Sequence, residues 1–252
     1  MTGNRRLFGL IGKPLEHSFS QRYFTEKFKS LGLGDHRYQL FELSSIGELE
    51  ALIAEHPELA GLNVTLPYKK QVIDFLTDLS PEAQRIGAVN TIKFTPDNAR
   101  VGYNTDYHGF YQSLKTWLGS SSPKKALVLG TGGASMAVTC ALEDLSMDIT
   151  SVSRKPSEEV ITYRQLHEMD LRNFELIVNT TPLGMAPHIT TLPDLRYEQI
   201  GVGHFLYDLV YNPQVTAFME QGNQQGAQVK GGLEMLQLQA EKAWDIWNHI
   251  NP

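Results

Sequence analysis

Short apolar runs alternate with amphipathic segments along nearly the whole chain, and this alternation restricts the possible folds more than any other feature. Strands that alternate with helical segments are typical of βα units, which assemble a mostly parallel sheet. The sequence therefore predicts an α/β fold. We expect strands at Leu7 to Ile11, Tyr38 to Leu43, Leu59 to Thr65, Val89 to Phe94, Lys125 to Leu129, Asp148 to Ser153, Glu175 to Asn179, Phe205 to Leu209 and Gln228 to Lys230.

Helices are expected in the gaps between these strands. One runs from Ser80 to Gly87, and another has Pro67 in its first turn, where proline is well tolerated. Ser45 and Glu48 have the spacing of a capping box and would open a third helix.

The chain has 252 residues, which is near the length at which a single hydrophobic core divides into two. We therefore expect two domains. A helical segment followed by a polar loop, residues 106–123, precedes a fresh strand, and we place the first boundary at residue 105/106. Residues 106–231 then form the second domain, and the C-terminal helix within 232–252 returns to the first domain, residues 1–105.

Composition narrows the functional classes. The net charge of -6 argues against binding to nucleic acid, because a grip on phosphate backbones depends on clustered Lys and Arg. The single cysteine, Cys140, permits no intrachain disulfide and fits a reducing compartment such as the cytoplasm. The N-terminal apolar run is too short for a signal peptide, and no run is long enough to span a membrane. The histidines have no metal-ligand spacing, so no metal is expected.

A glycine-rich turn, GTGGAS at residues 130–135, links a predicted strand to a predicted helix. Backbone N–H groups in such a turn can approach a pyrophosphate, whose charge is favoured at the helix N-terminus. An ordinary glycine-rich turn is the alternative, because Ser135 stands where the usual pattern has a third glycine. The residues expected to contact the cofactor here are Gly130, Thr131, Gly132, Gly133 and Ala134.

The residues after the next strand bear on the choice of dinucleotide. An acidic residue about twenty positions past the glycines would bind a ribose 2′-hydroxyl. Ser153, Arg154 and Lys155 occupy this place instead, and cations suit a 2′-phosphate. NADP is therefore expected rather than NAD, with a merely solvated basic loop as the alternative.

Polar residues in the first half of the chain follow apolar runs. The ends of strands are where ligands bind in open α/β sheets, so these residues are expected to face one crevice. They are Ser18, Ser20, Asn63, Thr65, Lys69, Asn90, Thr91, Asn104, Thr105 and Asp106.

These motifs, taken in order, resemble the shikimate dehydrogenase family along nearly the whole chain. The resemblance is carried by GKPLEHSFS, NVTLPYK, GAVNT, NTD, GTGGAS, NTTPLGM, DLVYNPQVTAF and GGLEMLQLQA. It implies an oxidoreductase that reduces 3-dehydroshikimate to shikimate with NADPH, a step of chorismate and aromatic amino-acid biosynthesis. It also implies an N-terminal substrate-binding and catalytic domain and a Rossmann-type dinucleotide-binding domain.

The same resemblance assigns site residues. Lys69 and Asp106 look like the catalytic pair, and Leu209 and Gly232 are expected to contact the cofactor. The residues that look like substrate contacts are Ser18, Ser20, Thr65, Asn90, Thr105, Tyr211 and Gln239.

The chemistry of the reaction fits these residue types. Hydride transfer to a ring ketone leaves an alkoxide, so a proton donor such as a lysine ammonium must stand close to that oxygen. A solvated surface charge is the alternative for Lys69, and it remains the interpretation for Lys70.

Simpler structural roles are open for several other residues. Ser18 with Gln21 has capping-box spacing, Gln239 could bond only to backbone, Tyr211 could be a core tyrosine, and Asn63 could bond a turn.

Two further functions remain open at this stage. A quinate or aminoshikimate dehydrogenase would use a similar set of residues, because these residues suit a hydroxylated cyclic carboxylate and do not specify every ring substituent. A dinucleotide- or metabolite-binding sensor that lost the chemistry belongs to another class, and the intact pair of Lys69 and Asp106 argues against it. The chain is expected to act as a monomer or a homodimer on small-molecule ligands.

Overall fold

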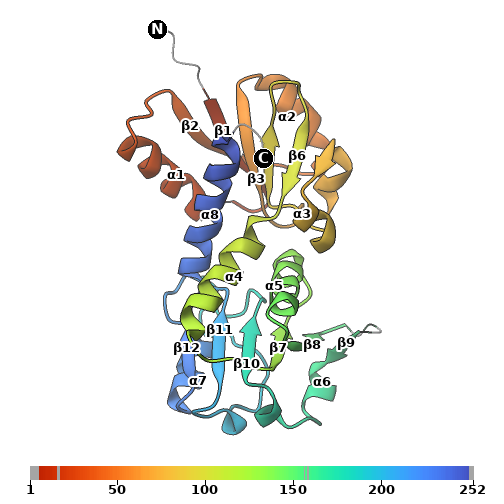
Figure 1. Cartoon of the computed structure of the whole chain (residues 1–252), viewed down its shortest axis with the longest axis vertical. Helices are drawn as coiled ribbons and strands as arrows, with labels where there is room; N and C mark the ends of the chain where they lie inside the picture. The colour runs from red at the N-terminus through yellow and green to blue at the C-terminus, as the bar shows by residue number, and fades with distance from the viewer. Residues whose placement is uncertain (1–5, 16–17, 156, 158, 250–252) are drawn as a thin grey trace. The chain divides into compact units, whose positions relative to one another are not determined.

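The computed structural model describes residues 6–15, 18–155, 157 and 159–249, and the chain divides into two compact units (Figure 1). Unit 1 comprises Met1–Thr105 and Ala240–Pro252, and unit 2 comprises Asp106–Gln239. The second division lies beyond the expected boundary at residue 231, inside helix α8 (Leu233–Asn248). This single helix packs Met235 into the core of unit 2 and Trp247 into the core of unit 1.

Unit 1 contains a mixed six-stranded sheet. β2 and β3 are parallel to β1, whereas β5 is antiparallel to both of its neighbours. The strand order is β2 (His36–Glu42), β1 (Arg6–Gly12), β3 (Leu59–Val64), β5 (Thr91–Phe94), β6 (Arg100–Tyr103), β4 (Asp78–Leu79).

Helices cover both faces of this sheet. Alternate residues of β1 point to opposite faces, so Phe8 packs against α1 (Phe19–Ser30) and α8, while Ile11 packs with α2 (Leu49–Glu55) and α3 (Pro81–Ile86). Two short 3-10 helices, η1 (Ile46–Glu48) and η2 (Gln71–Phe75), complete this unit.

Unit 2 contains a fully parallel six-stranded sheet of Rossmann type. Its order is β9 (Val160–Thr162), β8 (Asp148–Ser153), β7 (Lys125–Leu129), β10 (Leu176–Asn179), β11 (Phe205–Asp208), β12 (Gln228–Lys230). This is the doubly wound order: the chain adds β8 and β9 on one side of β7 and then returns to add β10, β11 and β12 on the other side. In such sheets ligands bind beyond the carboxyl ends of the strands at this switch point, here between β7 and β10.

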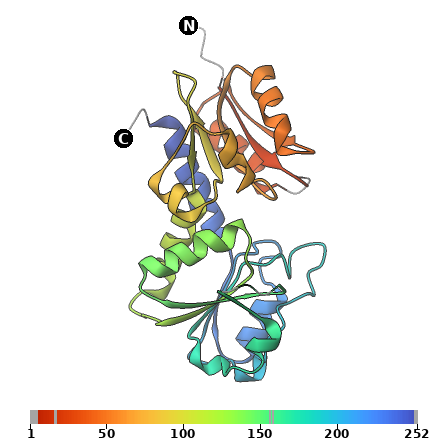
Figure 2. The same cartoon turned by 90° about the vertical axis from the view of Figure 1, so that its right-hand side faces the viewer.

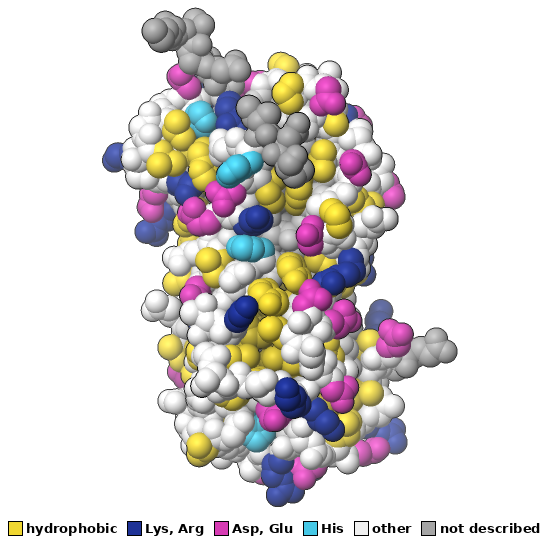
Figure 3. Space-filling model, viewed as in Figure 1, with side chains coloured by type: hydrophobic (Ala, Val, Ile, Leu, Met, Phe, Trp, Pro, Cys, Tyr) yellow, Lys and Arg dark blue, Asp and Glu magenta, His cyan; other side chains and the backbone are white. Residues whose placement is uncertain are grey.

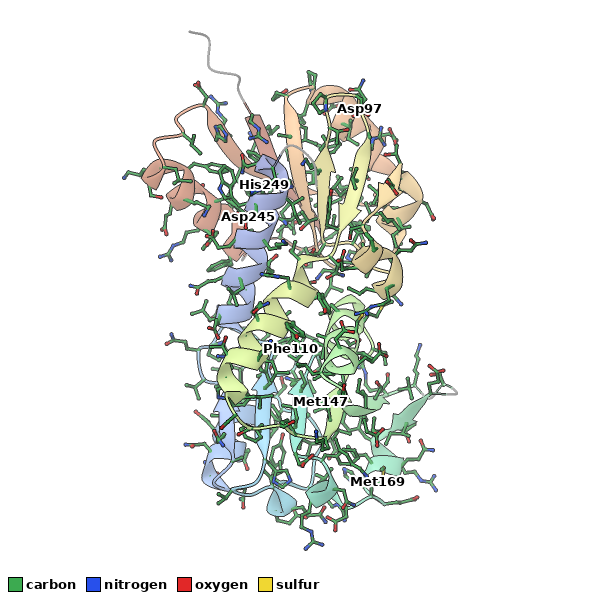
Figure 4. The ribbon with its side chains drawn as sticks, viewed as in Figure 1. Asp97, Phe110, Met147, Met169, Asp245 and His249 are labelled. Carbon is green, nitrogen blue, oxygen red and sulfur yellow. The ribbon has the colours of Figure 1, made fainter. Side chains whose placement is uncertain are left out.

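Helices also sandwich the sheet of unit 2, as Figure 2 shows. α4 (Thr105–Leu118) and α5 (Gly133–Asp144) lie over one face, and α6 (Tyr163–Leu166) and α7 (Ala217–Gln224) over the other. Phe110 of α4 points onto the sheet, where its ring centroid lies 5.1 Å from that of Tyr207 (Figure 4). Two further 3-10 helices are η3 (Leu171–Asn173) and η4 (Tyr197–Gln199).

The structure confirms the α/β fold class and each of the nine expected strands, to within two residues at most ends. It adds β4, β6 and β9. The helix at Ser80 is confirmed, since the Ser80 hydroxyl caps α3 and Gly87 closes it with a φ of 69°. The helix expected at Pro67 is wrong: Pro67 lies in a turn, and a 3-10 helix begins only at Gln71.

The capping box expected at Ser45 is also wrong. Ser45 precedes η1 but makes no side-chain cap, and Glu48 accepts a hydrogen bond from the backbone N–H of Ser44 instead, at 3.1 Å. The helical segment is therefore opened by a 3-10 turn, and the regular α-helix begins at Leu49.

Helix length and the grouping of ligating side chains bear on membranes and metals. In the part of the chain that the structure describes, helices are all too short or too polar to cross a membrane. The same residues form no group of three or more His, Cys, Asp and Glu side chains that could hold a metal ion. On the face drawn in Figure 3, Lys and Arg side chains are interspersed with Asp and Glu side chains.

Candidate active site

Polar side chains in unit 1 form one buried hydrogen-bonded cluster at the ends of strands. Asn90 Nδ2 donates to Thr105 Oγ1 at 3.0 Å, and the Thr105 backbone N–H donates to Asn90 Oδ1 at 2.7 Å. Asn63 Nδ2 donates to Thr91 Oγ1 at 3.2 Å, and Asn63 Oδ1 accepts from the Tyr38 hydroxyl at 2.8 Å. The structure therefore brings Asn90 and Thr105 together. Asn63 Nδ2 also donates to the Asn90 backbone carbonyl, which fits the alternative that Asn63 has a structural role.

The turn that carries Lys69 is anchored on both sides. Tyr68 is buried, and its hydroxyl donates to the Leu43 carbonyl at 2.7 Å. The Thr65 carbonyl accepts from the Tyr68 N–H at 3.0 Å, and the Lys69 carbonyl accepts from the Val89 N–H at 2.7 Å. The backbone at Lys69 is therefore fixed although it belongs to no regular element.

The beginning of α4 is fastened to the same part of the chain. Asn104 Nδ2 donates to the Ala88 carbonyl at 2.9 Å, next to the bonds between Thr105 and Asn90. Asp106 follows in the first turn of α4, is only 7% exposed, and begins unit 2. A carboxylate in this turn is favoured by the helix dipole. Segment 88–90 thus holds both the turn of Lys69 and the residue before Asp106.

Ser18 and Ser20 lie at the start of α1. Ser18 is the N-cap residue but its side chain makes no capping hydrogen bond, so the capping box with Gln21 is wrong. Ser20 acts on Tyr38: burial raises the pKa of the Tyr38 phenol, and the Ser20 hydroxyl opposes the rise. Tyr38 is a neighbour that the sequence did not single out.

The glycine turn of unit 2 leaves open space at the N-terminus of α5. Gly130 has a φ of +107°, which L side chains rarely adopt, and Gly132 caps α5 with open space where a side chain would be. Thr131 and Gly132 are exposed, while residues 133–134 begin the helix. Ser135 is buried and its hydroxyl donates to the Gly132 carbonyl at 2.7 Å. The hydroxyl of Ser135 therefore bonds to the turn at the position where a third glycine was expected.

The end of β8 lies beside this turn. Ser153 Oγ accepts from Thr131 Oγ1 at 3.4 Å, and the Lys155 N–H points to the same oxygen at 3.4 Å. The side chains of Arg154 and Lys155 are exposed. The structure thus places the basic pair one strand away from the glycine turn.

A cavity of about 290 Å³ lies at the other side of the switch point in unit 2. A Cβ added at Gly232 would overlap the Leu209 carbonyl, so only glycine fits there. Tyr211 is partly exposed on the cavity wall, so the alternative of a buried core tyrosine is wrong. The cavity is lined by Tyr211, Gln214, Gly231, Gly232, Leu233, Glu234 and Gln237.

Glu234 on this wall is held by two donors. Ser113 Oγ donates to Glu234 Oε2 at 2.8 Å, and Lys230 Nζ pairs with the same oxygen at 2.5 Å. The hydrogen bond from Lys230 lowers the pKa of Glu234, so this side chain is ionised near neutral pH.

Gln239, the last residue of unit 2, is 8% exposed, and its Nε2 donates to the Leu236 carbonyl at 2.9 Å. This bond fits the alternative that Gln239 bonds to the backbone rather than to a substrate. α4 and α8 approach closely here, because a Cβ on Gly109 would overlap the Met235 carbonyl.

One buried carboxylate was not singled out from the sequence. Asp208 ends β11 with no exposed surface and accepts hydrogen bonds from Asn179 and Thr216. The signal was present in the sequence, because an apolar run that ends in an acid is unusual for a buried strand.

The fold and these sites define a class of protein: a two-unit α/β protein with a polar cluster in one unit and, in the other, a Rossmann-type sheet with a glycine turn before a helix. Comparison with known proteins narrows this class. Residues 10–92 match the family model described as the shikimate dehydrogenase substrate binding domain. The chain is 39% identical over 249 residues to shikimate dehydrogenase (NADP(+)) of Clostridium beijerinckii, covering 95% of this chain and 91% of the relative.

Solved structures agree with these matches. Shikimate dehydrogenase 1 from Peptoclostridium difficile is 37% identical with a TM-score of 0.85, covering 98% of this chain and 93% of that chain. Shikimate 5-dehydrogenase from Thermus thermophilus, in complex with NADP(H) and shikimate, is 31% identical with a TM-score of 0.84, covering 98% of this chain and 95% of that chain. The chain belongs to the shikimate dehydrogenase family.

Proposed function

We propose that this chain is an NADP-dependent shikimate dehydrogenase that reduces 3-dehydroshikimate to shikimate, reversibly. The observation that carries the proposal is the anchoring of two candidate catalytic positions to one short segment, residues 88–90. The turn of Lys69 bonds to Val89, and the residue before Asp106 bonds to Asn90. Relatives of this family are named for the same reaction and cofactor.

The residues of unit 2 fit NADP. Gly132 leaves open space at the N-terminus of α5, where a pyrophosphate is favoured. The residues that follow β8 are Arg154 and Lys155 rather than an acid, which suits a 2′-phosphate. Leu209 and Gly232 lie on the β11 side of the sheet, where the other end of the dinucleotide would lie. Gly130, Thr131, Gly133, Ala134 and Ser153 complete the proposed cofactor contacts.

The substrate contacts are proposed in unit 1, in the segment after β11 and in α8. A hydroxyl pair at a helix start, Ser18 and Ser20, suits the substrate carboxylate. The remaining proposed substrate contacts are Thr65, Asn90, Thr105, Tyr211 and Gln239.

Lys69 and Asp106 are the proposed catalytic pair. The hydride that the carbonyl carbon receives comes from NADPH when it is bound. As the C=O double bond opens, the ketone oxygen takes a proton from the Lys69 ammonium, which becomes a neutral amine and regains a proton from water. In the reverse direction the amine accepts the proton of the shikimate hydroxyl.

A spectrophotometric assay tests this function. Purified protein is given shikimate with NADP, and reduced cofactor is followed at about 340 nm, a wavelength set by the reduced nicotinamide. Turnover with shikimate and NADP supports the proposal. Faster turnover with quinate would assign a quinate dehydrogenase, and binding of NADPH without turnover of any cyclic keto acid would assign a sensor.

The role of Lys69 has a matched control in the next residue. Lys69→Ala is expected to lower kcat by at least about a hundredfold with little change in KM, because it removes an interaction made in the transition state. Lys70→Ala, in the same turn, is expected to keep nearly normal turnover. Near-normal turnover of Lys69→Ala would remove this lysine from the mechanism.

A further inference from the structure

Three segments of unit 2 converge on the carboxylate of Asp208, at the carboxyl end of β11. Asn179 Nδ2 donates to Oδ1 at 2.9 Å, and the Val210 N–H donates to the same oxygen at 3.0 Å. Thr216 Oγ1 donates to Oδ2 at 2.6 Å. Asp208 has no exposed surface, so these donors replace all the water that the carboxylate would otherwise bind.

The donors are themselves structural junctions. Asn179 ends β10, and its Oδ1 accepts from the Thr181 N–H at 3.0 Å and from Thr181 Oγ1 at 2.6 Å. Thr216 caps α7 by accepting from the Met219 N–H at 3.3 Å. A single carboxylate therefore holds the loop after β10, the segment after β11 and the start of α7.

The segment after β11 forms one wall of the 290 Å³ cavity. The Val210 carbonyl accepts from the Gly232 N–H at 3.1 Å, and Gly232 packs directly against Leu209. Tyr211 and Gly232 both line the cavity. A displacement of Val210 would therefore move the cavity wall.

The expected direction of the dinucleotide across the sheet indicates which of its ends would lie against segment 209–211. The basic residues that suit the 2′-phosphate follow β8, on one side of the switch point between β7 and β10. A dinucleotide spans this switch point, so its nicotinamide end lies on the side of β10 and β11.

We propose that Asp208 is a positioning residue for the nicotinamide end of the cofactor: its carboxylate holds segment 209–211 against Gly232. This inference rests on the proposed function. Asp208 itself touches no reacting atom and acts through the backbone of Val210 and the side chains of Asn179 and Thr216.

The network needs the ionised carboxylate, because each of the groups that face it is a donor. Burial raises the pKa of Asp208 to about 6, against the hydrogen bonds from Thr216, Val210 and Asn179, which lower it. None of these donors titrates near neutral pH. The hydroxyl of Tyr197 in η4 donates to the Pro193 carbonyl, and burial and then the charge of Asp208 raise the pKa of Tyr197, so it stays neutral. Acidification from neutral pH therefore protonates Asp208, and the added proton competes with the donors from Asn179, Val210 and Thr216.

Two ligands distinguish a positioning role of Asp208 from a general loss of protein stability. Dissociation constants are measured by calorimetry, at about pH 7.5, for NADP and for 2′-phospho-ADP-ribose, which lacks the nicotinamide ring. Asp208→Asn is expected to weaken NADP about tenfold, the size of one charge-assisted hydrogen bond, and to leave 2′-phospho-ADP-ribose within about twofold.

His204→Gln is the matched control, because His204 precedes the same strand at its other end. It is 7% exposed, its Nδ1 accepts from the Gly201 N–H at 3.0 Å, and its Nε2 lies 3.3 Å from the Leu171 carbonyl. Losing these buried bonds should lower stability and leave both dissociation constants unchanged.

The wild-type protein supplies a second readout that needs no variant. Between about pH 7.5 and about pH 5.5, the ratio of the NADP to the 2′-phospho-ADP-ribose dissociation constant is expected to rise about threefold, because most of Asp208 becomes protonated. The ratio cancels titration of the 2′-phosphate, which both ligands carry, and the 5′-diphosphate of both ligands does not titrate in this range. In Asp208→Asn the ratio should stay constant.

The outcomes are distinct. Equal weakening of both ligands, or NADP affinity unchanged in a folded Asp208→Asn protein, would overturn the positioning role. If the variant does not fold, a wild-type ratio that is flat with pH overturns it instead. If the wild-type protein binds neither ligand, the proposed function itself fails.

Discussion

The raised pKa of the buried Asp208 carboxyl predicts how the free energy of unfolding depends on pH. Its pKa is raised from 3.8 to about 6, first by burial. Because folding raises the pKa, the contribution of this group to stability is full below pH 3.8 and is lost as the pH rises through about 6. A shift of about two units is worth about 3 kcal/mol at 1.36 kcal/mol per unit, and about 2 kcal/mol of this falls between about pH 4.5 and about pH 7.5.

Urea unfolding of the wild type and of Asp208→Asn across this pH range measures the effect. The free energy of unfolding of the wild type, minus that of the variant, should fall by about 2 kcal/mol as the pH rises, because other groups cancel in the difference. Asp170→Asn is the control in the same unit. A hydrogen bond from Arg172 lowers the pKa of Asp170, so its difference should change in the opposite direction. Parallel curves for the wild type and Asp208→Asn would refute the assignment of a raised pKa.

Three other substitutions test packing and cofactor binding. Gly61→Ala would push a Cβ into the indole of Trp247 and should lower the free energy of unfolding by about 1–3 kcal/mol in urea, whereas Gly34→Ala, which meets open space, should not. Gly232→Ala would overlap the backbone after β11 and should raise the KM for NADPH at least about tenfold in the assay of reduced cofactor; an unchanged KM would exclude close approach there. Arg154→Gln should lower the preference for NADP over NAD, as the ratio of kcat/KM values, about tenfold, and an unchanged ratio would mean that this side chain is merely solvated.

The strands were predictable because most of them are buried on both faces. In a parallel sheet covered by helices, such strands are continuous apolar runs, as in the fully buried β10. The strands missed from the sequence, β4, β6 and β9, are short and at or next to sheet edges, with few buried residues. Periodicity gives little signal there, because neither face of the strand is fully covered.

Helix starts were predicted less well because the motif does not determine the geometry. Ser80 caps its helix as expected, while Ser18 and Ser45 make no side-chain cap. A true capping box occurs at Thr162 and Gln165, and this pair was not singled out from the sequence. The spacing of a serine and an acid or amide is therefore compatible with several local structures, and tertiary contacts choose among them.

The positions of polar residues at strand ends followed from the sequence, but their partners did not. Asn90 and Thr105 were expected in one crevice, and they are hydrogen bonded to each other in unit 1. The bond between Asn179 and Asp208 joins residues 29 positions apart on neighbouring strands. Such a pair is set by the order and register of β10 and β11, which periodicity alone does not give.

The two polar networks differ in a way that bears on how each unit responds to pH. In unit 1 the network around Asn63 and Asn90 is built from amides and hydroxyls, each of which both donates and accepts. In unit 2, Asn179 is joined to a carboxylate that can only accept while it is ionised. An asparagine at position 208 would avoid the desolvation of a charge, but it would present an amide N–H to a site that supplies donors alone. The carboxylate therefore gives a more rigid wall near neutral pH, and it makes unit 2 the unit whose ligand cavity should loosen first on acidification.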